Sequence, residues 1–312
     1  MGITRTTAQL LLSEAAKRPF RGSVATLGRQ HIYFSLDDLR GWAARDGVTL
    51  TSGVPIQPHR EPHLAERGWV SDETVLRSLG FERIVRIDVS NYEEVEVLFD
   101  LNVPETPPEL CGQFDVILNL GTLEHVFHTP NALAHLHRML RPGGRIVHLF
   151  PSANCLDHGF VCVSPTFVTD YYAANRYRIH EVSLLRYRTD HELSGIDVYD
   201  YLQPDPYGCP VGGLDDRIYH TFAVVERGPD STADVVPQQS FYTARWGADG
   251  VSNGPAGEAA TRSRADRLRQ TTAGWPVVRN VAAAAIDGWR WLRRTVMKWR
   301  NPVPWKWVRR LH

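Results

Sequence analysis

Hydrophobic residues in the middle of the chain form two short apolar runs separated by an amphipathic segment. The runs cover residues 114–118 and 145–150 and are rich in Val, Ile, Leu and Phe without strict alternation, which is typical of parallel strands covered by helices on both faces. Residues 129–140 open with Thr-Pro and carry apolar side chains at helical spacing. A Pro-Gly-Gly turn at 142–144 then returns the chain to the sheet. The stretch is predicted to be a strand, a helix and a second parallel strand.

The same alternation continues over residues 1–227, which we interpret as one domain. The pattern predicts helices at 7–17 and 35–44, a short helix after Ser71 and another after Ser164. Further strands are expected at 23–27, 83–87, 95–99, 182–187 and 218–225. Two insertions interrupt the domain. Residues 45–69 are rich in Pro and Gly, and residues 188–216 form a long aromatic-containing insertion that we expect to cover a substrate.

Two phrases make the middle stretch more specific. FDVILNLGTLEHV and MLRPGGRIVHLFP resemble the fourth and fifth strands of class I S-adenosylmethionine-dependent methyltransferases, where a Glu-His pair follows strand four. DVSNYEEVEVLFDLN and the later His-Gly-Phe segment resemble a subset found in glycan and specialised-metabolite pathways. The resemblance implies an α/β, Rossmann-like, doubly wound fold. It would have a mostly parallel seven-stranded sheet with helices on both faces.

The resemblance also implies S-adenosyl-L-methionine as cofactor, bound at the carboxyl ends of the strands. The residues expected to bind it lie at or just after strand ends: Gly28, Asp88, Asp100, Leu101, Asn119 and Gly121. Asp88 is assigned to the ribose hydroxyls, with a turn-forming Asp before Ser90 as the alternative. Asp100 is assigned to the adenine amino group, with Leu101 beside it. The family's Gly-x-Gly-x-Gly turn is reduced to Gly28, which is followed by Arg29, Gln30 and His31. Among the implied properties, cofactor binding therefore has the least support from the motifs.

Methyl transfer to a hydroxyl or amine requires an aligned acceptor and removal of its proton. His158 and His125 are the candidate bases, since both lie on loops at the expected cofactor edge, and Glu124 adjoins His125. A structural role for the Glu-His pair is the alternative. Cys155 and Cys162 flank His158 with a spacing that is poor for zinc, so no metal is expected. His59 and His63 are expected to be solvated loop residues.

Charge and cysteine content limit the partners and the compartment. Lys plus Arg and Asp plus Glu both number 35, and this balance makes nucleic-acid binding unlikely. The four cysteines contain no CxxC pair, which favours a reducing, cytoplasmic setting. No apolar stretch reaches the length of a membrane-spanning helix.

The end of the chain differs in composition from the domain. Residues 228–274 are predicted to be a flexible linker. Residues 275–312 hold six of the nine tryptophans and nine basic residues against Asp287. An amphipathic helix at an anionic membrane surface fits this pattern. Docking on the domain or on a second protomer is the alternative, and nucleic acid ranks last. Peripheral attachment to the inner face of the membrane is therefore an extension of the cytoplasmic location.

Three functions are compatible with these features. The first is methylation of a hydroxyl or amine on a small-molecule, glycan, glycolipid or specialised-metabolite acceptor. The second is a protein that keeps the fold without methylation and serves as a membrane-tethered scaffold or partner. The third is an α/β enzyme with a different nucleotide cofactor.

Overall fold

The computed structural model describes residues 2–187, 195–201, 216–240, 242–243 and 305–311. One compact unit comprises Met1–Tyr201, Asp215–Pro237 and Trp305–His312. A second comprises Leu202–Leu214 and Gln238–Pro304, of which only 238–240 and 242–243 are described. Most of the predicted linker, the tail up to residue 304 and most of the predicted substrate-covering insertion therefore lie outside the described residues.

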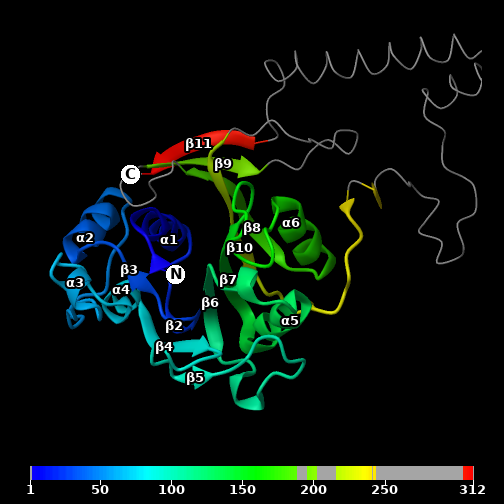
Figure 1. Cartoon of the computed structure of the whole chain (residues 1–312), viewed down its shortest axis with the longest axis horizontal. Coiled ribbons are helices and arrows are strands. Elements are labelled where there is room, and N and C mark those ends of the chain that lie inside the picture. The colour runs from blue at the N-terminus through cyan, green and yellow to red at the C-terminus, as the bar shows by residue number, and fades with distance from the viewer. Residues whose placement is uncertain (1, 188–194, 202–215, 241, 244–304, 312) are drawn as a thin grey trace, which may run out of the picture. The chain divides into compact units, whose positions relative to one another are not determined.

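The first unit is built on a nine-stranded sheet in the order β11-β9-β8-β10-β7-β6-β2-β4-β5 (Figure 1). The strands are β2 (Gly22–Leu27), β4 (Phe81–Asp88), β5 (Val97–Leu98), β6 (Phe114–Leu120), β7 (Leu140–Pro151), β8 (Arg178–Tyr187), β9 (Ile196–Tyr201), β10 (Ile218–Glu226) and β11 (Trp305–Leu311). The pairs from β5 to β7 are parallel, and those from β7 to β11 are antiparallel. β1 (Gly2–Ile3) and β3 (His31–Ile32) form a separate parallel pair.

The predicted mostly parallel, seven-stranded sheet was therefore wrong in strand number and direction, although all seven expected strands are present. β9 lies inside the insertion predicted at 188–216, and β11 lies at the end of the tail predicted to be helical. The two added strands pair with each other, and β9 pairs with β8. β9 follows its partner β8 directly, with Arg186 paired to Asp197, whereas the partner of β11 lies about a hundred residues away, which is why the local pattern did not reveal β11.

The described chain contains six helices: α1 (Arg5–Lys17), α2 (Leu36–Arg45), α3 (Pro62–Ala65), α4 (Asp72–Ser78), α5 (Thr129–Met139) and α6 (Pro165–Ala174). Figure 1 shows α1, α2 and α4 on one side and α5 and α6 on the other. Val24 of β2 belongs to the core under the first group, and the next residue, Ala25, belongs to the core under the second. Successive strand residues thus serve two cores, which explains the uninterrupted apolar runs and confirms the doubly wound arrangement.

Local signals set most of the helix ends. Ser35 starts α2 with a capping box that includes Asp38, and Ser71 caps α4 through Thr74 N. The Pro-Gly-Gly segment behaves differently from the prediction. α5 ends at Met139 and β7 begins at Leu140, so residues 142–144 lie within the irregular start of a strand.

The segment expected to begin the linker is held against the domain. Asn175, at the end of α6, accepts hydrogen bonds from Thr232 Oγ1 (2.9 Å) and Val235 N (3.1 Å). Ser231 Oγ donates to the Arg176 carbonyl at 2.8 Å. Residues 228–237 are therefore part of the first unit. No helix in the described part of the chain is long and apolar enough to cross a membrane.

A buried ion pair joins α1 to β7. Arg145 Nη1 donates to Glu14 Oε1 and, at 2.9 Å, to the Arg18 carbonyl. The Glu14 side chain is only 1% exposed and also accepts from Arg18 Nε at 2.8 Å. The strand and the first helix are thereby joined through charges that water does not screen.

Removing the charge of Glu14 should destabilise the domain. Glu14→Gln leaves Arg145 buried without its anion, and a loss of about 3 kcal/mol of unfolding free energy is expected. Urea unfolding of the full chain measures it. Asp37→Asn is the control, because the Asp37–Arg40 pair is largely exposed and should leave the midpoint unchanged. Equal midpoints for Glu14→Gln and the unmodified protein would contradict the assignment.

Candidate active site

The carboxyl ends of β2, β4 and β6 meet at Gly28. Gly28 has a φ of +73°, which favours glycine, and its N–H donates to the Ile87 carbonyl at 2.7 Å. A Cβ on Gly28 would lie 3.4 Å from Asp88 Oδ2 and 4.0 Å from Thr122 Oγ1. Thr122 Oγ1 in turn donates to the Leu27 carbonyl at 2.7 Å. Residues from three strand ends therefore surround one point at the edge predicted to bind the cofactor.

Asp88 combines both roles considered for it. Its Oδ1 accepts a hydrogen bond from Ser90 N at 2.9 Å, as a turn-forming Asp does. Its Oδ2 lies next to Gly28 and has no hydrogen-bond donor among the described residues. This second oxygen is available to a ligand hydroxyl.

Asp100 and Leu101 follow the short strand β5. Phe99 N donates to the Asp88 carbonyl at 2.8 Å, which keeps the two acidic residues on neighbouring strand ends. Hydrogen bonds from the backbone and then the side chain of Asn102 lower the pKa of Asp100. Leu101 is buried. The pair thus provides a charged acceptor beside an apolar residue.

Asn119 shapes the turn after β6 and is fully buried. Its Oδ1 accepts from Thr122 N (3.3 Å) and Leu123 N (3.1 Å), and its Nδ2 donates to His148 Nδ1 at 3.1 Å. Gly121, with a φ of +103°, completes the turn. The side chain of Asn119 therefore positions this loop, and any contribution it makes to a cofactor site is through the turn.

The three residues predicted to be catalytic come together in space. Glu124 and His125 lie in the 3-10 helix η2 (Leu123–His125), and His158 lies on the loop after β7. Their potential ligand atoms all fall within 4.8 Å of one another. Glu124 Oε1 lies 3.5 Å from His158 Nε2, and the two imidazole rings are 5.4 Å apart.

The loop that carries His158 is bound to the backbone of Glu124. Phe160 N donates to the Glu124 carbonyl at 2.7 Å. A Cβ on Gly159 would lie only 2.7 Å from the same oxygen, so the approach requires glycine at this position. This contact fixes two loops that are distant in sequence against each other.

The cluster is electrostatically unusual because its carboxylate is buried. The Glu124 side chain is 1% exposed, and neither of its oxygens has a hydrogen-bond partner among the described residues. Burial raises the pKa of Glu124 to about 7. Burial, followed by the neighbouring His158, lowers the pKa of His125.

Exposed apolar side chains adjoin the cluster. Phe127 and Phe160 are each 68% exposed and meet edge to face with ring centroids 5.6 Å apart. Leu156, on the same loop as His158, is also exposed. The sequence analysis did not single out these residues, although each lies within two positions of a candidate catalytic residue.

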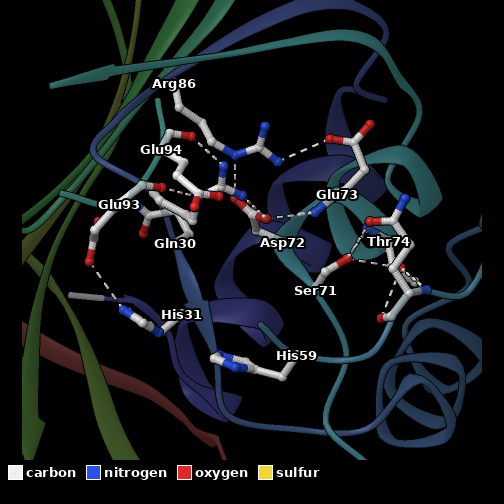
Figure 2. Close-up of polar contacts among 12 residues, drawn as sticks. Gln30, His31, His59, Ser71, Asp72, Glu73, Thr74, Arg86, Glu93 and Glu94 are labelled. Atoms are coloured by element: carbon white, nitrogen blue, oxygen red, sulfur yellow. Dashed lines mark hydrogen bonds and ion pairs between the residues drawn. The ribbon is translucent and has the colours of Figure 1, made fainter. Parts of the chain in front are cut away.

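A polar pocket of about 480 Å³ lies beside the Gly28 turn. Its lining includes the three side chains that follow Gly28: Arg29, Gln30 and His31. Figure 2 shows the ion-pair network at this pocket, where Arg86 binds Asp72 at 2.6 Å and Glu73 at 3.0 Å. The side chains that stand where the family has glycines therefore line a neighbouring pocket.

One of the two inserted-loop histidines belongs to this pocket. His59 is 5% exposed and stacks on His31 with ring centroids 5.3 Å apart, so the expectation of a solvated residue was wrong for it. His63 is exposed, as expected. The contact that buries His59 is with a strand nearly thirty positions away, which the local sequence did not reveal.

Residues 62–196 match the family model described as a methyltransferase domain. This segment is therefore a methyltransferase domain, as the resemblance to the class I S-adenosylmethionine-dependent methyltransferases implies. This match confirms the resemblance carried by the strand-four and strand-five phrases. The matched part of the methyltransferase domain contains Asp88, Asp100 and the Glu124–His125–His158 cluster, whereas Gly28 precedes it.

Solved structures resemble the methyltransferase domain only distantly. The N-methyltransferase NodS from Bradyrhizobium japonicum WM9 in complex with S-adenosyl-L-homocysteine is 15% identical, covers 72% of this chain and 85% of its own, and has a TM-score of 0.37. The 1,6-didemethyltoxoflavin-N1-methyltransferase of Burkholderia thailandensis is 11% identical, with coverages of 72% and 79% and a TM-score of 0.33. TehB from Haemophilus influenzae is 10% identical, with coverages of 69% and 61% and a TM-score of 0.33. No curated protein sequence matches the chain. Similarity at this level says nothing about the acceptor.

The methyltransferase domain should lose stability in acid through His148. Burial lowers the pKa of His148 to about 3, against about 6.5 in an unfolded chain. Between these values the unfolded chain binds a proton that the folded chain does not, so stability falls as pH drops, by up to about 1.4 kcal/mol per pH unit.

Urea unfolding between pH 8 and pH 4 tests this behaviour. His148→Gln should be less stable at pH 8, because it loses the hydrogen bonds to Asn119 and Tyr172, but its stability should fall less steeply with acid. His63→Gln, on an exposed residue, should keep the original slope. An unchanged slope in His148→Gln would show that another group controls the acid response.

Proposed function

We propose that the protein transfers a methyl group from S-adenosyl-L-methionine to a hydroxyl or amine of an acceptor molecule. The observation that carries the proposal is the arrangement at Gly28, where Asp88 Oδ2 stands without a donor beside a left-handed glycine and Thr122. A ribose diol needs an acceptor of this kind at the end of the second strand of the fold.

The residues of this edge suit the rest of the cofactor. Asp100, whose charged form is favoured by Asn102, can accept from an adenine amino group, and Leu101 supplies an apolar neighbour. The bound cofactor supplies a methyl group already activated on a sulfonium. The protein must therefore mainly hold the acceptor in line and provide for its proton.

The cluster of Glu124, His125 and His158 is the proposed acceptor site. It begins two residues after Thr122, whose side chain contacts the end of β2. His125 and His158 are both exposed, so their imidazoles are accessible to an acceptor. In this assignment they take or polarise the acceptor proton.

The exposed side chains of Phe127, Leu156 and Phe160 favour an acceptor with an apolar part. Phe127 and Phe160 contact each other, and exposed apolar side chains that gather beside a site can contact the apolar part of a ligand. Among the acceptors considered, this favours a glycolipid or an apolar specialised metabolite over a free glycan.

A protein that keeps the fold without methylation is the second candidate. The observation that favours it is the polar sequence Arg29-Gln30-His31 where the family has glycines. Arg29 is held there by the carbonyls of Glu93 (2.7 Å) and Glu94 (2.6 Å). In this case the tail would serve to tether a scaffold to a membrane.

Asp88→Asn should weaken binding of S-adenosylmethionine and of its demethylated product by about tenfold or more, because one charge-assisted hydrogen bond is lost. Isothermal titration calorimetry of the full chain measures both ligands. Asp37→Asn, on the surface of α2, should bind like the unmodified protein.

Two outcomes would contradict these assignments. Unchanged affinity in Asp88→Asn would refute the ribose assignment. If the unmodified protein binds neither ligand, the scaffold function replaces methyl transfer.

The tail supports a further part of the proposal, a peripheral contact with anionic membrane. Residues 275–304 carry six basic residues against Asp287, together with Trp275, Trp289, Trp291 and Trp299. Each basic residue near an anionic surface contributes about 1 kcal/mol. The location proposed is therefore the cytoplasmic side, at the inner face of the membrane.

Replacement of Trp289, Trp291 and Trp299 by Ser should weaken sedimentation with vesicles that contain anionic lipid, because only the contacts of the basic residues remain. These substitutions leave β11 intact, whereas a truncation would remove the strand that pairs with β9. Vesicles of neutral lipid are the control and should bind the unmodified protein weakly. No pelleting of the unmodified protein would exclude the membrane contact, and equal pelleting of both proteins would exclude a contribution from the three tryptophans.

A further inference from the structure

Glu124 presents a problem that methyl transfer alone does not explain. Its side chain is 99% buried, and neither oxygen receives a hydrogen bond from the described residues. Burying an ionisable group without a partner costs several kcal/mol, and native proteins almost always provide a partner. The nearest basic atom is His158 Nε2, at 3.5 Å.

The spacing of the three side chains is that of a metal site. Oxygen and nitrogen ligands about 2.1 Å from a tetrahedral ion lie about 3.4 Å apart. Glu124 Oε1 and His158 Nε2 already have this separation, 3.5 Å. All three ligand atoms lie within 4.8 Å of one another. Both histidines are exposed. Rotation of their side chains can therefore shorten the distances between the ligand atoms from at most 4.8 Å to about 3.4 Å.

We propose that Glu124, His125 and His158 bind a divalent first-row cation such as Zn²⁺. A carboxylate with two imidazoles is a ligand set that such ions favour. Three protein ligands leave at least one coordination position for water or for another molecule. Since the imidazoles are exposed and the carboxylate is buried, this position faces the solvent side of the cluster.

The backbone around the cluster holds the ligands for this purpose. Phe160 N and Val161 N donate to the Glu124 carbonyl at 2.7 and 3.3 Å, and Gly159 allows the close approach. The loop that carries His158 is thus fixed to the residue that supplies the carboxylate. A site assembled from supported loops binds an ion with less reorganisation than a flexible surface pair.

The role of the ion rests on the proposed function. With the ion bound, the two imidazoles would be ligands instead of bases, and an acceptor hydroxyl at the open position would lose its proton to water more readily. The resulting oxygen would attack the methyl carbon as the carbon–sulfur bond breaks, and the electron pair would pass to sulfur to give the neutral thioether. A cation at this position favours an oxygen acceptor over a protonated amine.

Calorimetric titration of Zn²⁺ into the full-length protein, after dialysis against a chelator and then metal-free buffer, tests the site. The unmodified protein is expected to bind one ion per chain more than Glu124→Gln binds. Glu124→Gln and His158→Gln should each weaken binding by at least about a hundredfold, since loss of an outer-shell partner alone costs 10- to 100-fold. His128→Gln removes a neighbouring exposed histidine and should leave the affinity unchanged.

Thermal unfolding provides a second measurement that does not depend on activity. Without metal, Glu124→Gln should be about as stable as the unmodified protein, because a neutral amide replaces a buried carboxyl group whose charged form is disfavoured by burial. Added Zn²⁺ should raise the melting temperature of the unmodified protein and of His128→Gln. It should not raise that of Glu124→Gln.

Absence of binding to the unmodified protein, or equal binding by Glu124→Gln, would overturn the proposal. Failure of the metal site and failure of the proposed function are distinguishable. Zn²⁺ binding is measured without cofactor, and S-adenosylmethionine binding is measured on metal-free protein.

Discussion

The turn after β6 depends on a buried chain of side-chain hydrogen bonds. Tyr172 of α6 contacts His148 Nε2 at 2.6 Å, and His148 Nδ1 accepts from Asn119 at 3.1 Å. Asn119 then accepts from the N–H groups of Thr122 and Leu123. These hydrogen bonds run from a helix through two strands to the loop, and those of Tyr172, His148 and Leu123 are buried. They thereby set both Thr122, which contacts the end of β2, and Glu124, which begins the cluster with His125 and His158.

The acidic residues at this edge of the sheet are held in two different environments. Asp88 and Asp100 each accept hydrogen bonds from the next turn, and both side chains are only partly buried, so they are accessible to a polar ligand. Glu124 is buried without a donor. A group placed in this way stores an unfavourable energy that a proton or a cation can relieve. Asp88 and Asp100 are thus suited to bind a neutral ligand that carries hydroxyl groups. Glu124 is suited to the proton or cation chemistry proposed for the cluster.

The missing glycines have a structural explanation of their own. Arg29 is bound to the carbonyls of Glu93 and Glu94, and Gln30 donates back to the carbonyls of Leu27 and Gly28. The turn after β2 is therefore held by side-chain contacts. Gly28 alone keeps the left-handed conformation that the approach to Asp88 needs. The same turn therefore places Arg29, Gln30 and His31 in the lining of the polar pocket and places Gly28 beside Asp88 and Thr122.

The sequence by itself determined seven of the nine strands of the large sheet, the starts of helices such as α2 and α4, and the edge of the sheet at which the candidate residues lie. Apolar runs such as that of β6 are local, because each strand residue is buried on one of two faces. Caps such as Ser35 and Ser71 act within one turn. Only the tertiary structure decided which distant segments meet. It paired β9 with β11, buried His59 on His31 and brought His158 to Glu124. Each of these contacts joins residues far apart in the chain, and its free energy depends on the geometry of both partners, which no local pattern contains.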